Sequence, residues 1–292
     1  MQLKGVITSM PTPFNENLTI SEETLVDEIT YHLSSGIHGL CLLGGTGEFL
    51  SLTNDERKNV IELGVETVNG KIPIVAGCFL PQPEQMLSLA SEFAAIGANA
   101  IMLAPPAFYK LNSYHFEKFL DTLFEKLSIP VVIYNAPGRV SVNFTSDEMG
   151  TLVKKFPNVV GVKDASANMV QVAQMAVDFP ERCALLQAID ELFLPTLTVG
   201  GKGGIIAAAT IFPEIFVSIY EKILTGDLEK PISLHHKVVQ LMRVLDLHPM
   251  PVMVKHAMTL VGRSMGGTRE PLYPVAATDI KLLEETLAIF DS

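Results

Sequence analysis

The stretch that decides the fold is Val159-Val160-Gly161-Val162-Lys163, an apolar run that ends in a charged residue. It shows no alternation of apolar and polar residues, which is typical of a parallel strand covered on both faces. Seven other short apolar runs recur along the chain, at intervals of roughly 20 to 35 residues. They span residues 6–10, 40–43, 72–76, 100–103, 131–134, 184–187 and 204–208. The sequence therefore predicts eight buried strands.

Amphipathic segments lie between these runs, and some of them carry helix-start signals. Residues 53–56 and 145–148 both read Thr-x-x-Glu, the pattern of a capping box. Eight strands that alternate with helices predict an α/β fold, a (β/α)8 TIM barrel, over residues 1–225. Residues 226–292 contain helical patterns but no comparable strand run. We expect them to form a C-terminal helical extension of about three helices, suited to an oligomer contact or to covering one side of the barrel.

The amino-acid composition and the net charge argue against some classes of binding partner. The chain of 292 residues is 48% hydrophobic and 18% charged, which is typical of a well-packed globular protein, and its net charge is −11. That charge argues against nucleic acid or an anionic membrane surface as a partner. The first residues show no signal-peptide pattern, and no uninterrupted apolar run of about 18 residues occurs, so we expect a cytoplasmic protein with no membrane partner. Because Cys41, Cys78 and Cys183 include no CxxC pair, they predict reduced core thiols instead of a disulfide framework or a zinc site.

The predicted strands sort the sequence motifs into two faces of the barrel. Active sites of TIM barrels form at the carboxyl ends of the strands, whereas the opposite face serves stability. The residues that end or follow predicted strands, and so fall on the working face, are Thr46, Tyr134, Lys163, Asp164 and Asp190. The glycine-rich segment 200–204 looks like a phosphate loop, but it precedes the eighth strand. We therefore expect it to be a helix-to-strand turn on the opposite face.

Lys163 and Tyr134 end two neighbouring predicted strands, so their side chains should meet at one edge of the sheet. An amine removed from water favours its neutral form, which attacks carbonyl groups. A phenol beside the nitrogen supplies the proton shuttle that iminium formation and carbon–carbon cleavage need. The pair predicts Schiff-base chemistry on a 2-oxo acid. In the alternative interpretation, the ammonium of Lys163 reaches solvent or pairs with Asp164, and Tyr134 is a core aromatic residue.

Two further segments could bind carboxylates. Gly44-Gly45-Thr46-Gly47-Glu48 directly follows the second strand, where glycines let backbone N–H groups turn toward an anion and Thr46 adds a hydroxyl donor. In the loop after the fifth strand, Arg139 could clamp a second carboxylate. A tight turn and a surface arginine are the plain alternatives.

A metal site is the rival chemistry. The seven histidines form no HExxH pattern, and none of them ends a predicted strand. Glu48, Asp164 and Asp190 could nevertheless gather at the working face as oxygen ligands for Mg²⁺. That arrangement would indicate a metal-dependent lyase.

Five segments resemble, in their order and spacing, the dihydrodipicolinate synthase / N-acetylneuraminate lyase family of Schiff-base-forming class I aldolases. They are residues 8–14 (TSMPTPF), 44–48 (GGTGE), 134–139 (YNAPGR), 161–166 (GVKDAS) and 267–272 (GTREPL). The resemblance implies that Lys163 forms an imine with pyruvate or the pyruvyl part of a substrate, and that Tyr134 and Thr46 take part in catalysis. The substrate-binding residues that it implies are Gly45, Thr46, Arg139 and Ile206. It also implies a homotetramer, built as a dimer of dimers, with neither a metal ion nor an organic cofactor.

Two branches of the family stay open, because the chain departs from both. YNAPGR looks like the synthase branch, in which Arg139 receives the carboxylate of aspartate semialdehyde. That branch usually has two adjacent hydroxylated residues in the turn after the second strand, where this chain has Gly45 before Thr46. It also has a relay tyrosine where this chain has Phe108, followed by Tyr109. GGTGEF-x-SL looks instead like the branch that dehydrates keto-deoxy sugar acids, which lacks the Pro-Gly-Arg element.

Three functions follow from these patterns. The first is a dihydrodipicolinate synthase-like lyase that joins pyruvate to an aldehyde such as aspartate semialdehyde. The second is a 2-keto-3-deoxy sugar-acid aldolase or dehydratase, which the missing hydroxyl groups favour. Residues 187–190 (QAID) stand where the synthase branch more often has a Gly-Asp-Asp pattern, which leaves that wall of the site less polar. The third is a non-catalytic regulator that binds a 2-oxo acid and keeps Lys163 and Arg139 without turnover.

Overall fold

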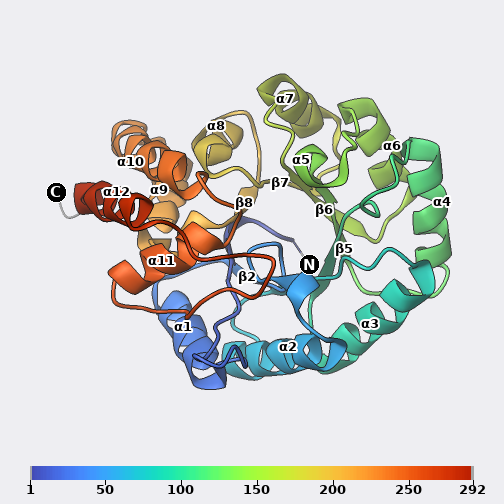
Figure 1. The fold of residues 1–292 in the computed structure, drawn as a ribbon. Coiled ribbons are helices and arrows are strands. Elements are labelled where there is room, and N and C mark those ends of the chain that lie inside the picture. Colours follow the sequence, from blue (N-terminus) through green and yellow to red (C-terminus); the bar gives the residue numbers. More distant parts are fainter. Residues whose placement is uncertain (1, 291–292) are drawn as a thin grey trace.

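A computed structural model describes residues 2–290, which form a closed barrel of eight parallel strands surrounded by helices (Figure 1). Neighbouring strands pair in chain order, and β8 closes the barrel against β1. The strands are β1 (Gly5–Ser9), β2 (Gly39–Leu42), β3 (Ile74–Gly77), β4 (Ala100–Leu103), β5 (Val131–Asn135), β6 (Val159–Asp164), β7 (Ala184–Gln187) and β8 (Gly203–Ile206). The predicted TIM barrel is confirmed, and each predicted run matches a strand to within two residues.

The strands are buried on both faces, as their continuous apolarity requires. Alternate side chains, such as those of Ile7, Val75 and Met102, fill the barrel interior. Their neighbours, such as Val6 and Ala76, point outward and pack under the helices. This alternation decides which strand-end residues can reach a site inside the mouth of the barrel.

Helices alternate with the strands and form the outer ring. They are α1 (Glu22–Ser34), α2 (Asn54–Val68), α3 (Pro83–Ile96), α4 (Ser113–Phe124), α5 (Pro137–Val140), α6 (Ser146–Lys155), α7 (Met169–Asp178), α8 (Phe193–Thr198) and α9 (Pro213–Leu224). Both predicted capping boxes are present, at Thr53 before α2 and at Thr145 before α6. Each threonine accepts the N–H of a glutamate three residues later, and that glutamate accepts the threonine N–H in return.

Three more helices follow the barrel, as predicted: α10 (Glu229–Leu245), α11 (Val252–Leu260) and α12 (Ala277–Leu287). Figure 1 shows them together on the side of the ring that carries α9. α10 also contacts η2 (Asp190–Leu192), the short 3₁₀ helix that follows β7. The predicted boundary at residue 225 falls between α9 and α10, and the division into a barrel domain and an extension stays a prediction. Among residues 2–290, no helix combines the length and the apolarity that crossing a membrane requires.

The three cysteines are buried free thiols, as predicted. Burial raises the pKa of Cys41 to about 11 and the pKa of Cys78 and Cys183 to about 12. Because the thiolate is the reactive form, these thiols are chemically inert core residues.

Segment 200–204 is a helix-to-strand turn, as predicted. It follows α8, and Gly203 opens β8. The N–H of Gly5 donates to the carbonyl of Lys202 at 2.8 Å, which ties the turn to the beginning of β1. The segment therefore lies at the amino-terminal ends of the strands, on the stability face.

Candidate active site

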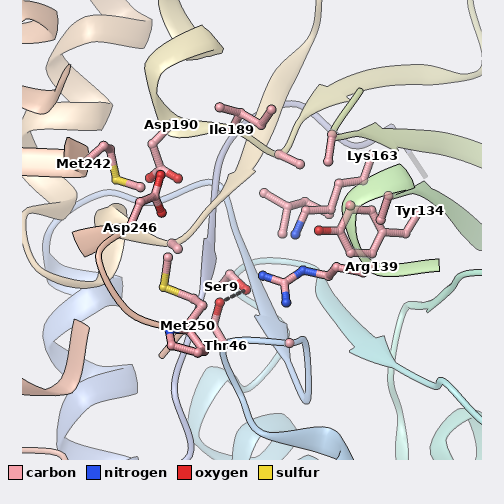
Figure 2. Close-up of a pocket in the computed structure, with 18 of the residues that line it drawn as sticks. Ser9, Thr46, Tyr134, Arg139, Lys163, Ile189, Asp190, Met242, Asp246 and Met250 are labelled. Atoms are coloured by element: carbon pink, nitrogen blue, oxygen red, sulfur yellow. Dashed lines mark hydrogen bonds between the residues drawn. The ribbon is translucent and has the colours of Figure 1, made fainter. Parts of the chain in front are cut away.

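A cavity of about 420 Å³ lies at the carboxyl ends of the strands. Its walls come from strand ends, from the loops that follow them and from the C-terminal helices (Figure 2). Five of the six residues predicted to act at a site line this cavity together, and they are Gly45, Thr46, Tyr134, Arg139 and Lys163. The structure thus gathers residues that are up to 118 positions apart in the sequence.

Lys163 and Tyr134 occupy matching positions on the paired strands β6 and β5. Lys163 is only 6% exposed, and its Nζ lies 4.5 Å from the centroid of the Tyr134 ring. Figure 2 shows both side chains extending into the cavity from the same wall. Because the next residue, Asp164, projects to the other face of β6, the alternative in which Lys163 pairs with Asp164 or extends into solvent does not describe this arrangement.

Asp164 organises a buried polar network behind the wall that carries Lys163 and Tyr134. Its Oδ1 accepts from Asn135 Nδ2 at 2.8 Å, and its Oδ2 accepts from Ser166 Oγ at 2.6 Å. Asn135 also donates to Asn143 at 2.9 Å, and Gln171 exchanges hydrogen bonds with Asn143. These bonds join the loop after β5, which carries Arg139, to the loop after β6. They hold the two loops next to Lys163 without using the Lys163 amine.

The turn after β2 brings Gly45 and Thr46 to the opposite side of the amine. Thr46 is buried, and its Oγ1 accepts a hydrogen bond from Ser9 Oγ at 3.2 Å. Arg139 reaches over this turn from α5, since a Cβ built on Gly45 would lie 3.9 Å from the Arg139 Cζ. Figure 2 shows the guanidinium of Arg139 pointing toward Ser9 and Thr46. Hydroxyl and guanidinium donors therefore converge on one end of the cavity, which suits a carboxylate.

Three carboxyl residues, Asp190, Glu191 and Asp246, also line the cavity, and Figure 2 shows Asp190 and Asp246 across it from Lys163. Burial raises the pKa of Asp190 to about 7, although its hydrogen bond from the Ala208 N–H at 2.8 Å and the charge of Lys163 act in the other direction. Burial also raises the pKa of Glu191 and of Asp246. The Oε2 of Glu191 has no hydrogen-bond partner among the described residues. Because the pKa of Asp190 is about 7, this carboxyl group can either donate or accept a hydrogen bond near neutral pH.

A buried ion pair fixes the turn after β2 to the C-terminal extension. Glu48 has a left-handed backbone (φ 54°), and its Oε1 lies 2.7 Å from the Nζ of Lys255 in α11. Lys255 also donates to the carbonyl of Gly267 at 2.6 Å, while the N–H of Arg269 donates to Glu48 Oε2 at 3.0 Å. Burial lowers the pKa of Lys255 to about 8 against the attraction of Glu48. We call Glu48, Lys255 and Arg269 the clamp, because they join the turn after β2 to a segment more than 200 residues away.

The carboxylates of the metal alternative do not form a cluster. Glu48 pairs with Lys255, Asp164 bonds to Asn135 and Ser166, and Asp190 accepts the Ala208 N–H. In residues 2–290, no three His, Cys, Asp or Glu side chains are placed to hold a metal ion. The predicted Mg²⁺ grouping of Glu48, Asp164 and Asp190 is therefore wrong as geometry, because the three side chains leave different faces of the barrel wall.

Comparison with known proteins identifies the family. The sequence model of the Dihydrodipicolinate synthetase family matches residues 2–289. The chain belongs to this family. It is 34% identical to the 4-hydroxy-tetrahydrodipicolinate synthase of Methanopyrus kandleri, over 98% of this chain and 96% of the relative. It is 32% identical to the enzyme of the same name from Methanocaldococcus jannaschii, over 97% of both chains.

Solved structures of the dihydrodipicolinate synthetase family share the fold over nearly the full chain. A crystal structure of dihydrodipicolinate synthase from Aquifex aeolicus is 27% identical, with a TM-score of 0.94 over 99% of this chain and 98% of that one. A variant described as the first monomeric dihydrodipicolinate synthase is 28% identical, with a TM-score of 0.94 over 99% and 97% of the two chains. Family membership confirms the resemblance found in the sequence and the predicted lyase class.

Ile206 and Phe108 occupy positions that the family resemblance connects with the site, but neither residue lines the cavity. The Ile206 side chain packs in the outer core under the helices, while Ile205 and Ala207 line the cavity. The structure therefore gives the Ile206 side chain no contact with a substrate. Phe108 does not line the cavity of its own chain, and its side chain is 99% exposed on a left-handed backbone (φ 77°). Tyr109 beside it is 63% exposed, so neither ring completes the cavity within a single chain.

Sequence patterns missed several residues that line the cavity. Ser9 ends β1, and its position two residues after the inward-pointing Ile7 could have marked it as a cavity residue. Met242, Asp246 and His248 come from the extension, and no motif connects them to the barrel. His248 is held in place by Asp279 of α12, whose Oδ2 lies 2.8 Å from its Nε2.

Proposed function

We propose that this chain is a class I aldolase-type lyase that forms an imine between Lys163 and pyruvate or another 2-oxo acid. As its reaction we propose the condensation of pyruvate with an aldehyde such as aspartate semialdehyde. The observation that carries this proposal is the Lys163 amine, which is buried at the end of β6 beside the Tyr134 ring and faces a cavity. Relatives named 4-hydroxy-tetrahydrodipicolinate synthase, at 34% and 32% identity, support it.

The reaction follows from the groups at this wall. The neutral amine of Lys163 attacks the ketone carbon, and loss of one water gives the imine. Removal of a proton from the methyl carbon gives an enamine, whose carbon then adds to the aldehyde carbonyl. The Tyr134 phenol takes up and returns protons at the nitrogen and at the departing oxygen. Water finally adds to the imine, so the product leaves and the free amine is restored.

The donors at the other end of the cavity orient the substrate. The Thr46 hydroxyl and the backbone at Gly45 hold the carboxylate of the 2-oxo acid, which places its ketone carbon at Lys163. Arg139 then receives a second carboxylate, as in aspartate semialdehyde, through its planar guanidinium. The cavity volume of about 420 Å³ suits a substrate of this size.

The carboxyl wall favours a second candidate, a 2-keto-3-deoxy sugar-acid aldolase or dehydratase. Asp190, Glu191 and Asp246 face the place where the aldehyde part of the substrate would lie. Hydroxyl groups of a sugar chain can donate to carboxylates and accept from protonated carboxyl groups, whereas a further carboxylate would be repelled.

Borohydride trapping tests the imine. The protein would be reduced in the presence of pyruvate, with and without EDTA, and analysed by intact and peptide mass spectrometry. We expect one adduct, on Lys163, that does not depend on EDTA. Lys163→Arg, which keeps the charge but loses the nucleophilic amine, should give none. Absence of an adduct with pyruvate and with other 2-oxo acids would contradict the proposal.

Turnover then separates the candidate functions. Condensation of pyruvate with aspartate semialdehyde would favour the synthase, and cleavage or dehydration of keto-deoxy sugar acids would favour the second candidate. Gly45→Thr combined with Phe108→Tyr should raise synthase activity if the missing hydroxyl groups limit it, and the space at Gly45 accepts a Cβ at ordinary contact distance. An adduct on Lys163 without turnover of any aldehyde would indicate a 2-oxo-acid-binding regulator.

We further propose a homotetramer, a dimer of dimers, located in the cytoplasm. The exposed rings of Phe108 and Tyr109 support association, because large apolar side chains on a loop beside the cavity suit a protein contact. Buried free thiols at Cys41, Cys78 and Cys183 suit a reducing compartment. Sedimentation and cell fractionation test the two statements, and a monomer at micromolar concentration would contradict the first.

A further inference from the structure

Ser9 places a hydroxyl group at the carboxylate end of the cavity that no sequence motif predicted. It is the last residue of β1, and the alternation of the strand turns it inward with Ile7. Its side chain is buried and lines the cavity beside Thr46, as Figure 2 shows. The Ser9 backbone is held independently of this side chain, because Thr210 Oγ1 donates to the Ser9 carbonyl at 3.3 Å and β1 pairs Ser9 with Cys41.

The direction of the hydrogen bond between Ser9 and Thr46 matters for ligand binding. Ser9 Oγ donates to Thr46 Oγ1 at 3.2 Å, so Thr46 is the acceptor and its own hydroxyl hydrogen is left for another partner. Gly45 adds no side-chain hydroxyl. Among the described residues that line the cavity, the hydroxyl groups belong to Ser9, Thr46 and Tyr134. Thr46 is therefore the hydroxyl donor at the carboxylate end, and Ser9 decides where its hydrogen points.

We propose that Ser9 is a positioning residue that prepares Thr46 to bind the carboxylate of the 2-oxo acid. The inference rests on the proposed imine function of Lys163. A hydroxyl that already accepts one hydrogen bond becomes a stronger donor, and donation to an ionised carboxylate is stronger than donation to a neutral oxygen. Ser9 thus makes the site selective for a 2-oxo acid over a neutral ketone of the same shape. In this chain, β1 supplies a hydroxyl group that position 45 lacks.

The test compares pyruvate with methyl pyruvate, which keeps the ketone but has no carboxylate charge. The concentration that half-saturates borohydride-trapped adduct formation on Lys163 would be measured for the parent chain, Ser9→Ala, Thr46→Val and the double variant. We expect Ser9→Ala to raise this concentration by about three- to tenfold for pyruvate and by less than about twofold for methyl pyruvate. In the Thr46→Val background, Ser9→Ala should change it by less than about twofold.

Thr8→Val is the matched control. Thr8 precedes Ser9 on β1, and its buried Oγ1 has no hydrogen-bond partner in residues 2–290. This variant removes a hydroxyl group from the other face of the same strand, so half-saturation should stay at the parent value for both ketones. If Ser9→Ala does not fold, Ser9→Cys, which keeps a side chain of similar shape but is a weak donor, takes its place.

Each other outcome overturns the inference in a distinguishable way. Equal shifts for the two ketones would show a general structural role for Ser9, and additive effects of the two substitutions would show that Ser9 acts without Thr46. No shift in Ser9→Ala, while the parent chain is still trapped at Lys163, would remove the role of Ser9 and leave the proposed function standing. Failure of the parent chain to form any adduct would overturn both.

Discussion

Two loops at the mouth of the barrel, one after β2 and one after β4, differ in what surrounds them. The turn after β2 is enclosed by its own chain, through the clamp and through Thr12, whose Oγ1 donates to the Gly47 carbonyl at 2.7 Å. The loop after β4 presents Phe108 and Tyr109 to the outside instead. The first loop carries Thr46, which lines the cavity, and the second contributes no residue to its lining. A single chain therefore encloses the turn that carries Thr46, whereas the rings of the loop after β4 stay outside the cavity lining.

The clamp also shows what the C-terminal extension does. The extension covers one side of the barrel, as expected, and it also supplies residues to the cavity through α10 and the segment after it. Through Lys255 and Arg269 it holds the turn that carries Thr46. Four predictions test this contrast between the enclosed and the exposed loop.

Lys255→Met should have the largest effect. It leaves Glu48 buried without its counter-charge, so the free energy of unfolding should fall by about 3–5 kcal/mol. Urea denaturation at pH 7 measures it. The double variant Glu48→Gln, Lys255→Met removes both charges and should recover most of the loss. A Lys255→Met protein as stable as the parent would show that the clamp does not hold the loop.

Arg269→Gln should have the next largest effect. Arg269 makes two contacts to Glu56, at 2.6 and 2.9 Å, and donates to the carbonyls of Leu18 and Ser51. Loss of the Arg269 guanidinium leaves the Glu56 carboxylate and the two carbonyl groups without their hydrogen-bond donor. The free energy of unfolding should therefore fall by about 1–3 kcal/mol. Lys58, whose ion pairs are on the surface, is the control, and Lys58→Gln should lower the free energy of unfolding much less than Arg269→Gln does. Equal costs would contradict a special role for Arg269.

Asp190→Asn tests the carboxyl groups that line the cavity. Burial raises the pKa of Asp190 to about 7, so between about pH 4 and pH 7 the folded chain keeps a proton that the unfolded chain releases. The stabilising contribution is complete below about pH 4 and is lost as the pH rises through 7. Asparagine has no such titration and keeps an acceptor for the Ala208 N–H. The free energy of unfolding of the variant, compared with that of the parent, should therefore be roughly 1–3 kcal/mol higher at pH 8 than at pH 4. Parallel pH profiles of the unfolding free energy of the two proteins would refute this.

Phe108→Ala should have the smallest effect on the stability of the single chain. With its side chain 99% exposed, its removal should change the free energy of unfolding by less than about 0.5 kcal/mol. Phe49→Ala is the matched truncation in the enclosed loop, where the ring is 1% exposed and lies under the Arg57 guanidinium, and it should cost about 3–5 kcal/mol. If the exposed rings form a contact between chains, Phe108→Ala should also lower the apparent mass in sedimentation. A large loss of stability in dilute protein would show that Phe108 packs within its own chain.

Sequence periodicity predicted the barrel and the meeting of Lys163 with Tyr134, because both depend on the local pattern of apolar runs. Runs buried on both faces mark parallel strands, and two residues that end neighbouring strands must meet, which is how Lys163 and Tyr134 were found. Ile206, which the family resemblance implied, shows what a local pattern leaves open. Whether a strand residue points inward or outward depends on the register of the whole barrel, and here β8 turns Ile205 inward. The first run contains two hydroxyl residues, Thr8 and Ser9, and only the barrel shows that Ser9 is the one that lines the cavity.

The sequence by itself determined the barrel, the three following helices and five residues of the cavity, because hydrophobic period and strand ends are local properties, and its five motifs indicated the family. Only the tertiary structure decided that Lys255 and Arg269 hold the turn after β2, that Asp190, Glu191 and Asp246 line the cavity, and that Ser9 meets Thr46. These contacts join segments up to about 220 residues apart. Their partners are selected by barrel closure and by the packing of the last helices, and neither leaves a periodic signal in the chain.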